Sequence, residues 1–226
     1  MADETTAQEQ PLYLTKVTVP VRTALGKLKV RDSYDWHQRA WDLFGGREDK
    51  KRDFLIRVDK RDDYFQMLIL SAARPEKPTW CTANSFESKL IPDSFFNNST
   101  FRFSLLVNPT KKIASTNKEG NKTKNGKRLP LTKREDLVQW LKRKASRGGF
   151  GFEAEKLQTI PRGKEIFHKK GNARGTLNAF EFLGELSITD VQKFRSTLKN
   201  GVGSAKAFGF GLILLSPIKY NILSKT

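Results

Sequence analysis

Apolar and polar positions along this chain follow strand and helix periods in turn, and both halves repeat nearly the same order. In the first half, the pattern predicts a strand, a helix, a two-stranded hairpin and a short strand. Their ranges are 12–21, 32–46, 53–59 with 64–72, and 85–91, and a connector with two prolines covers 74–84. Either Asp32 or Ser33 can cap the helix.

The second half begins with an alternating strand at 100–109 and continues with a lysine- and glycine-rich stretch, 111–128, that we interpret as a mobile loop. Thr132 and Glu135 have the spacing of a capping box, which predicts the start of a helix. The remaining elements are two strands with a basic tip between them, a helix and a last strand, at 150–158, 176–188, 190–199 and 208–215.

Strand-helix-strand-strand-helix-strand is the ferredoxin-like plan. We therefore expect an α+β fold of two tandem ferredoxin-like (βαββαβ) domains, the first with a reduced second helix. The expected divisions are a disordered acidic tail, an N-terminal domain, a C-terminal domain and a C-terminal tail, at residues 1–11, 12–95, 96–218 and 219–226.

The chain is strongly basic: its 226 residues include 42 Lys+Arg and 24 Asp+Glu, for a formal net charge of +18. Thirteen basic and only three acidic residues lie within 111–147, and a second basic cluster covers 161–175. Such clusters bind polyanions, so we expect nucleic acid as the partner, ahead of an anionic membrane surface. The alternative is a solvated, solubilising surface. The apolar runs are too short to span a bilayer, and no membrane partner is expected.

The content of metal-binding and disulfide-forming residues is low, with one cysteine, Cys81, and two histidines. No internal disulfide can form, and a structural zinc site built from these ligands is excluded. No N-terminal stretch joins a basic run to an apolar one, as a signal peptide would. We therefore expect a cytoplasmic protein without a metal or a cofactor.

The segment at residues 201–218, GVGSAKAFGFGLILLSPI, combines four glycines with Lys206 ahead of an apolar strand. Because it follows a helix and lacks G-K-[ST], it does not match a loop that binds a nucleotide cofactor. Gly201 is expected to stop the preceding helix. Two interpretations stay open, namely an anion-binding backbone cradle and a glycine-rich turn packed against a sheet.

His37 shares one face of its predicted helix with Tyr34, three residues before it, and Trp41, four residues after it. A Tyr-His pair on a basic protein suggests acid-base chemistry on a phosphodiester, because imidazole titrates near neutral pH and a phenol can hydrogen-bond to phosphate. The alternative is a helix histidine packed at the edge of a core. His168, in the basic tip, is expected to contact nucleic acid or solvent rather than to catalyse.

Five segments occur here in one order, namely YDWHQRAWDLF, FRFSLLVNP, the basic stretch to RLPL, DLVQWLKRK and GVGSAKAFGFGLILLSP. Together they resemble the CRISPR repeat-RNA processing endoribonucleases of the type I-E kind, the CasE family, over about residues 12–217. The resemblance implies two ferredoxin-like domains and metal-free cleavage of a precursor transcript at the base of the repeat hairpin. It also implies a protein that is monomeric when alone, and that stays on its product RNA as a subunit of the Cascade complex, beside the other Cascade subunits.

On this resemblance, His37 and Tyr34 match the catalytic pair, and Lys206 with its surrounding glycines matches the glycine-rich loop. The expected reaction is attack of the ribose 2′-OH on the adjacent phosphate, which leaves a 2′,3′-cyclic phosphate and a 5′-OH and spares DNA. Whether His37 acts as base or acid stays open. Asp42 stands where some relatives carry a lysine, so the sequence does not identify the cation that stabilises the transition state.

The expected RNA-binding residues come from the glycine-rich loop, the strand 100–109, the lysine-rich stretch and the basic tip. They are Gly201, Gly203, Ser204, Lys206, Arg102, Lys111, Lys112, Arg162, Lys164, His168, Lys169, Lys170 and Arg174. Ser104 and Leu106 stand where relatives often carry arginines. The alternatives are a non-catalytic RNA-binding subunit of the same kind of complex, for which the Tyr34/His37 pair has no use, and a ribosome- or tRNA-associated basic protein.

Overall fold

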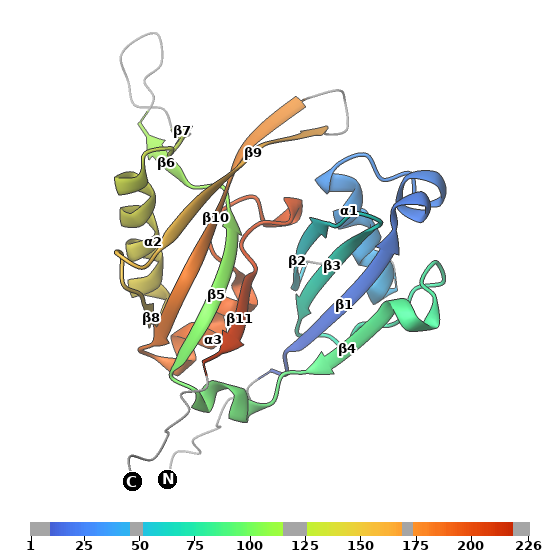
Figure 1. Ribbon diagram of the computed structural model, residues 1–226, viewed down its shortest axis with the longest axis horizontal. Helices are drawn as coiled ribbons and strands as arrows, with labels where there is room; N and C mark the ends of the chain where they lie inside the picture. Colours follow the sequence, from blue (N-terminus) through green and yellow to red (C-terminus); the bar gives the residue numbers. More distant parts are fainter. Residues whose placement is uncertain (1–9, 46–51, 115–125, 169–173, 219–226) are drawn as a thin grey trace, which may run out of the picture.

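The protein is described by a computed structural model over residues 10–45, 52–114, 126–168 and 174–218, so the expected tails lie outside it apart from residues 10 and 11. Two antiparallel sheets, one from each half of the chain, lie side by side (Figure 1). The N-terminal sheet has the strands β1 Tyr13–Pro20, β2 Phe54–Lys60, β3 Tyr64–Ser71 and β4 Phe86–Leu90. The C-terminal sheet has β5 Thr100–Val107, β8 Phe150–Gly151, β9 Gln158–His168, β10 Arg174–Ile188 and β11 Ile213–Pro217.

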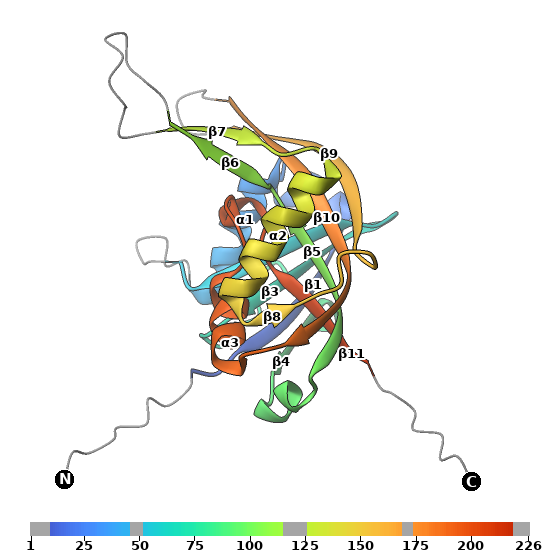
Figure 2. The ribbon, with the colours of Figure 1, turned by 90° about the vertical axis from the view of Figure 1, so that its left-hand side faces the viewer.

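The main helices are α1 Ser33–Trp41, α2 Arg134–Gly148 and α3 Val191–Asn200. Asp32 caps α1, because its Oδ1 accepts hydrogen bonds from the backbone N–H groups of Tyr34 at 2.9 Å and Asp35 at 3.2 Å. α1 packs on the apolar face of the N-terminal sheet through Trp36 and Ala40. α2 covers the outer face of the C-terminal sheet (Figure 2).

Both sheets have the strand order that the ferredoxin-like plan requires, which confirms the predicted α+β class. The N-terminal order is β2-β3-β1-β4, and the C-terminal order is β11-β5-β10-β8 with β9 also paired to β10. In the first half, the second helix is reduced to a short 3-10 turn, η3 Ala83–Ser85. The division into domains at residues 95–96 stays a prediction.

Several local predictions in the second half are wrong. The capping box does not form, because α2 begins at Arg134 after Lys133, one residue later than Thr132 would require. The segment before the helix is extended as β7, Lys127–Pro130. β7 pairs with β6, Thr110–Ile113, so the ends of the expected loop 111–128 form a small sheet. The last strand starts at residue 213 rather than 208.

The basic tip is built from the strands themselves, because β9 and β10 continue as a long hairpin up to residues 168 and 174. The expected strand 150–158 is instead interrupted between β8 and β9. The pairing shifts between Phe180 and Ala179, which makes Arg162 the extra residue of a bulge ahead of Gly163, at φ 90°. The bulge turns Arg162 towards Glu181, and the two side chains lie 3.2 Å apart.

A buried polar cluster joins the two sheets. Arg57 on β2 donates hydrogen bonds to Glu181 Oε1 on β10 at 2.7 Å and to Ser104 Oγ on β5 at 2.6 Å. Ser104 Oγ in turn donates to Glu181 at 2.6 Å, and Asp59 also accepts from the guanidinium at 3.0 Å. Burial alone would raise the pKa of Glu181, but the bonds from Ser104 and Arg57 hold that pKa below its ordinary value. The cluster fixes β2, and the helix α1 packed beside it, relative to the C-terminal sheet.

Candidate active site and nucleic-acid interface

His37 lies on the inner side of α1, where its ring packs on two aromatic side chains. The ring centroids of Trp41 and Phe54 lie 6.2 Å and 5.7 Å from that of His37. Only 9% of the residue is exposed, and Nδ1 is buried with no hydrogen-bond partner among the described residues. The histidine is therefore packed at the edge of a core, and Nε2 is the ring nitrogen left to meet a ligand.

The environment of His37 keeps its ring neutral. Burial lowers the pKa of His37 to about 4, and the guanidinium of Arg52 adds to the effect. At neutral pH the imidazole is therefore unprotonated and able to accept a proton. Of the two roles left open by the sequence, this favours the base.

Lys206 lies close enough to two other cations, Arg52 and Lys144, for their charges to act on it, and the sequence reasoning assigned neither of these two to the site. Arg52, just before β2, has a buried Nη1 without a hydrogen-bond partner among the described residues. Burial lowers the pKa of Lys206, and the charges of Arg52 and Lys144 lower it further. The described residues give none of the three a carboxylate partner. Cations that lie close together with no carboxylate partner in the described part of the chain favour an anionic ligand.

Asp42, at the position where some relatives carry a lysine, has a structural role here. Its Oδ2 accepts a hydrogen bond from Trp80 Nε1 at 2.7 Å and lies 3.4 Å from Arg39 Nη1. These contacts tie the end of α1 to the connector before β4. The cations near His37 come instead from Arg52 and the glycine-rich loop.

The glycines of residues 201–212 let this loop pack tightly. A Cβ on Gly201, at φ 71°, would lie 2.8 Å from Leu55 Cδ1, and one on Gly211, at φ 89°, would lie 2.6 Å from a backbone oxygen. The N–H of Gly201 donates to Thr197 O at 2.8 Å and is not available to an anion, so Gly201 ends α3 as predicted. Close packing therefore explains why Gly201 and Gly211 have no side chain. The loop as a whole positions Lys206.

Phe208 follows Lys206 and links three elements through its ring. It belongs to the 3-10 turn η5, Lys206–Phe208. Its ring centroid lies 6.5 Å from that of Tyr34 on α1 and 4.1 Å from that of Phe167 on β9. The catalytic candidate Tyr34, the glycine-rich loop and the basic hairpin thus meet at one point.

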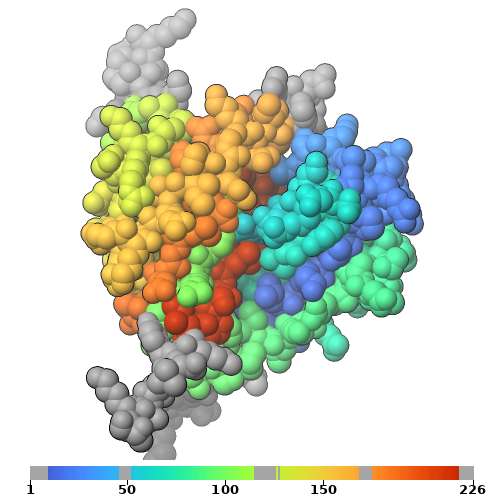
Figure 3. Space-filling model, viewed as in Figure 1, coloured from blue at the N-terminus to red at the C-terminus, as the bar shows by residue number. Residues whose placement is uncertain are grey.

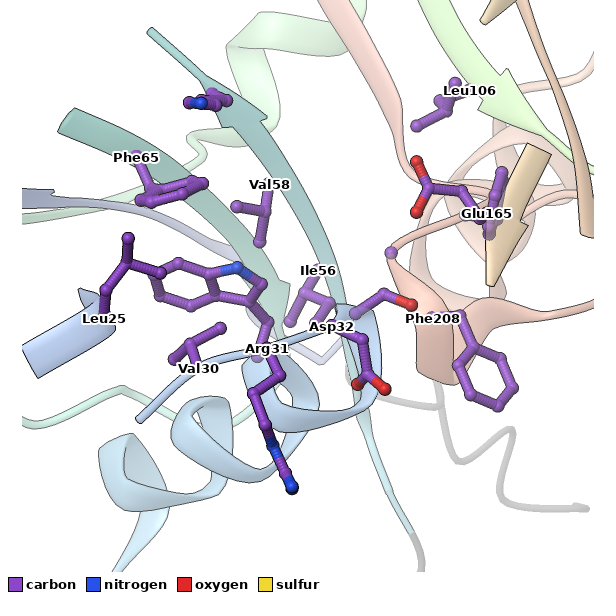
Figure 4. A pocket seen from close by; sticks show the side chains of 15 residues that line it. Leu25, Val30, Arg31, Asp32, Ile56, Val58, Phe65, Leu106, Glu165 and Phe208 are labelled. Carbon is purple, nitrogen blue, oxygen red and sulfur yellow. The ribbon is translucent and has the colours of Figure 1, made fainter. Parts of the chain in front are cut away.

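A cavity of about 310 Å³ opens between the two halves beside Phe208 (Figure 4). Apolar side chains from both halves line it, including Val30, Val58 and Phe65 from the N-terminal half and Leu106 and Phe208 from the C-terminal half, which also contributes Glu165. Figure 3 shows a hollow between the orange hairpin and the blue and cyan N-terminal half, with the dark-red glycine-rich loop at its floor. The two halves thus leave space next to the helix that carries Tyr34 and His37.

The predicted RNA-binding residues divide by position. Lys164 and Ser204 line a second cavity, of about 600 Å³, on the other side of Phe208. Lys111 and Lys112 are exposed on β6, which also contributes to this cavity. Gly203 packs on Trp140 of α2, with a Cβ position 3.2 Å from that ring.

Other predicted RNA-binding residues lie elsewhere. Arg162 pairs with Glu181, and its side chain stays half exposed. Arg102 lies near the start of β5, about 17 Å along the strand from its end at Val107, so it is not brought to His37. Lys169 and Lys170 lie outside the described residues, as do the side chains of His168 and Arg174.

The described part of the chain also bears on membrane and metal binding. No helix there has both the length and the apolar character needed to cross a membrane. No three His, Cys, Asp or Glu side chains gather there as a possible metal-binding group. Cys81 is buried and free, and burial raises its pKa to about 11, which makes it an unreactive packing residue.

Comparisons with known proteins agree on one family. The family model described as CRISPR associated protein matches residues 12–217. The CRISPR system Cascade subunit CasE of Escherichia coli is 30% identical, over 92% of this chain and 100% of its own length. The CRISPR-associated endoribonuclease Cse3 of Thermus thermophilus is 25% identical, over 91% of this chain and 100% of its own length.

Solved structures show the same fold. The crystal structure of the CRISPR-associated protein Cas6e from Escherichia coli has a TM-score of 0.67 at 26% identity, covering 91% of this chain and 100% of that chain. A structure of CRISPR endoribonuclease Cse3 bound to 19 nt RNA has a TM-score of 0.70 at 22% identity, covering 92% of this chain and 100% of that chain. At that identity, the second likeness concerns the fold alone.

Proposed function

This chain belongs to the CRISPR associated protein family, among the type I-E CasE proteins, and we propose that it is a metal-independent endoribonuclease that cleaves CRISPR precursor RNA within the repeat hairpin. The observation that carries the proposal is His37, held neutral on α1 near Arg52 and the loop that carries Lys206, two cations that lack a carboxylate partner among the described residues. A base next to an electropositive site is what cleavage by an internal ribose hydroxyl requires.

The reaction needs one nucleophile, which the RNA itself carries. Nε2 of His37 takes the proton of the 2′-OH, and the 2′-oxygen forms a bond to the adjacent phosphorus. The bond between phosphorus and the 5′-oxygen then breaks, the leaving oxygen takes up a proton from water, and His37 releases the proton that it took to solvent. The products are a 2′,3′-cyclic phosphate and a 5′-OH end. Tyr34, three residues before His37 on α1, orients the ribose or the phosphate through its phenol.

Arg52 and Lys206 supply the charge that the transition state needs. Both are partly buried, and burial lowers the pKa of each, because a charged group loses hydration there. A phosphate entering this site replaces the lost hydration, and its charge increases towards the pentacoordinate state. We assign Arg52 the part that a helix lysine plays in some relatives, a position that Asp42 occupies here.

The protein remains bound to the mature guide RNA as a Cascade subunit, in contact with other Cascade proteins. The relative from Escherichia coli is named as a Cascade subunit, which supports this role. The net charge of +18 supports a large phosphate-binding surface. Because such contacts outlast the cleavage step, slow release of the product is expected.

The test is cleavage of repeat RNA by three proteins in EDTA. The wild type and Gln38→Ala, a matched change on the same helix, should cut once in the repeat and leave a 2′,3′-cyclic phosphate. His37→Ala should bind the RNA equally well and cut it about 10²- to 10⁴-fold more slowly. A wild type that binds but never cuts would make the protein a non-catalytic RNA-binding subunit, and a requirement for metal would overturn the mechanism.

A further inference from the structure

The cavity of about 600 Å³ beside the glycine-rich loop has the size of a small-ligand pocket. It lies between the β6–β7 pair, the base of the β9–β10 hairpin and residues 204–208. In Figures 1 and 2 the β6–β7 pair and the hairpin extend from the same end of the C-terminal sheet. Segments far apart in the sequence therefore form one pocket.

The polar groups of this pocket are suited to an anion. Arg128 on β7 and Lys164 on β9 bring positive charge from two different elements. Ser204 adds a hydroxyl from the loop, and the lining contains no aspartate or glutamate. Two cations without a carboxylate favour a phosphate group.

Asn108 gives the pocket an oriented hydrogen-bond donor. The residue is only 7% exposed, and its Oδ1 accepts the backbone N–H of Asn178 at 3.2 Å. β5 ends at Val107, so the Asn108 side chain takes the place of the next strand residue beside β10. This bond fixes which side of the amide is oxygen. Nδ2 is left without a partner among the described residues, and it can donate to a group in the pocket.

Phe208 connects the pocket to the proposed catalytic residues. It lines the pocket, and its ring also lies against Tyr34, with centroids 6.5 Å apart. An aromatic wall is a surface on which a nucleobase can stack. A nucleotide held here would therefore lie next to the bond that is cut.

We propose that this pocket holds one unpaired nucleotide of the RNA, a direct neighbour of the scissile bond. Its phosphate lies between Arg128 and Lys164, its base lies against Phe208, and the edge of the base accepts a hydrogen bond from Asn108 Nδ2. The inference rests on the proposed function and extends it, because the pocket selects the substrate at the level of a single base.

The experiment measures binding of the repeat RNA from the same genome, with a 2′-deoxy scissile ribose to prevent cleavage. Each nucleotide is replaced in turn by an abasic one. For the wild type, we expect one unpaired position beside the scissile bond where loss of the base weakens binding about 10-fold. In Asn108→Ala and in Arg128→Gln, binding is weaker from the start, and the same abasic change has little further effect.

Lys111→Gln is the matched control, because it removes a neighbouring surface charge outside the pocket lining. It should lower affinity for all the RNAs equally and keep the 10-fold effect. If Asn108→Ala fails to fold, Arg128→Gln decides alone, since that side chain is exposed. The proposal of the pocket is overturned if no abasic position weakens wild-type binding, or if the abasic change weakens both pocket variants as much as the wild type. In either case unmodified repeat RNA is still cut, so the proposed function stands. If that RNA is neither bound nor cut, the pocket and the proposed function fail together.

Discussion

Replacement of Arg57 by methionine should destabilise the fold, because it removes one partner from a buried ion pair. The side chains of Arg57 and Glu181 are 6% and 8% exposed, and their contact is 2.7 Å. Breaking such a pair typically costs about 3–5 kcal/mol. Arg162, half exposed and 3.2 Å from Glu181, remains as a partner, so we expect the lower value, about 3 kcal/mol.

The assay is urea unfolding at pH 7, followed by tryptophan fluorescence, with a thermal scan beside it. A loss of about 3 kcal/mol corresponds to a fall in Tm of roughly 6–12 °C for a chain of this length. Lys16→Met is the matched control, because the Lys16–Glu87 pair has a similar contact, 2.9 Å, but is about half exposed on both sides. That change should cost less than about 1 kcal/mol. The double change Arg57→Met with Glu181→Leu should cost less than the sum of its parts.

The effect should also depend on pH with a defined sign. Glu181 has a folded pKa below its ordinary value of 4.5, so the stability that it contributes is complete above that pH and is lost as pH falls through the folded pKa. The difference between the wild type and Arg57→Met should therefore shrink in acid. A cost at pH 7 no larger than that of Lys16→Met would refute the reasoning.

Three further predictions concern the site. The pKa of His37 is lowered from 6.5 to about 4, so between these pH values the unfolded chain binds a proton at His37 that the folded chain does not. As pH falls from 6.5 to 4, the wild type should therefore lose about 3 kcal/mol of stability relative to His37→Gln, measured by urea unfolding. Arg52→Met should raise the pKa of His37, which NMR can follow because the chain has two histidines. Gly211→Ala, with a carbonyl oxygen 2.6 Å from the new Cβ, should cost about 2 kcal/mol or more, whereas Gly26→Ala, with nothing within 4 Å, should be nearly neutral in the same unfolding assay.

The fold was predictable where local pattern and long-range pairing agree. The alternation of residues 100–109 became β5, and the Asp32 cap started α1 as expected. The capping box at Thr132 was wrong: α2 begins one residue later, at Arg134, and no side-chain cap forms. A capping box is a pattern of only two residues, so it indicates that a helix starts nearby but does not fix the first residue.

The candidate site was predictable only in part. His37, Tyr34 and Lys206 could be proposed from the sequence, because their residue types and spacing resemble a family pattern, and their roles stay a prediction. Arg52 carries no such pattern, and its effect on His37 depends on where the fold places residue 52. Arg57 is a charged residue within the otherwise apolar strand FLIRV, which indicates a buried charge that needs a partner. That partner, Glu181, lies 124 residues away in the sequence. Pairings at that separation follow from the packing of the two sheets.

The central claim, that Nε2 of His37 takes the proton of the ribose 2′-OH, is tested most directly by chemical rescue. Single-turnover cleavage of repeat RNA by His37→Ala is measured with and without added imidazole. We predict a rate about 10²- to 10⁴-fold below the wild type, restored in part by imidazole in its neutral form. Cleavage by His37→Ala at the wild-type rate would contradict the account.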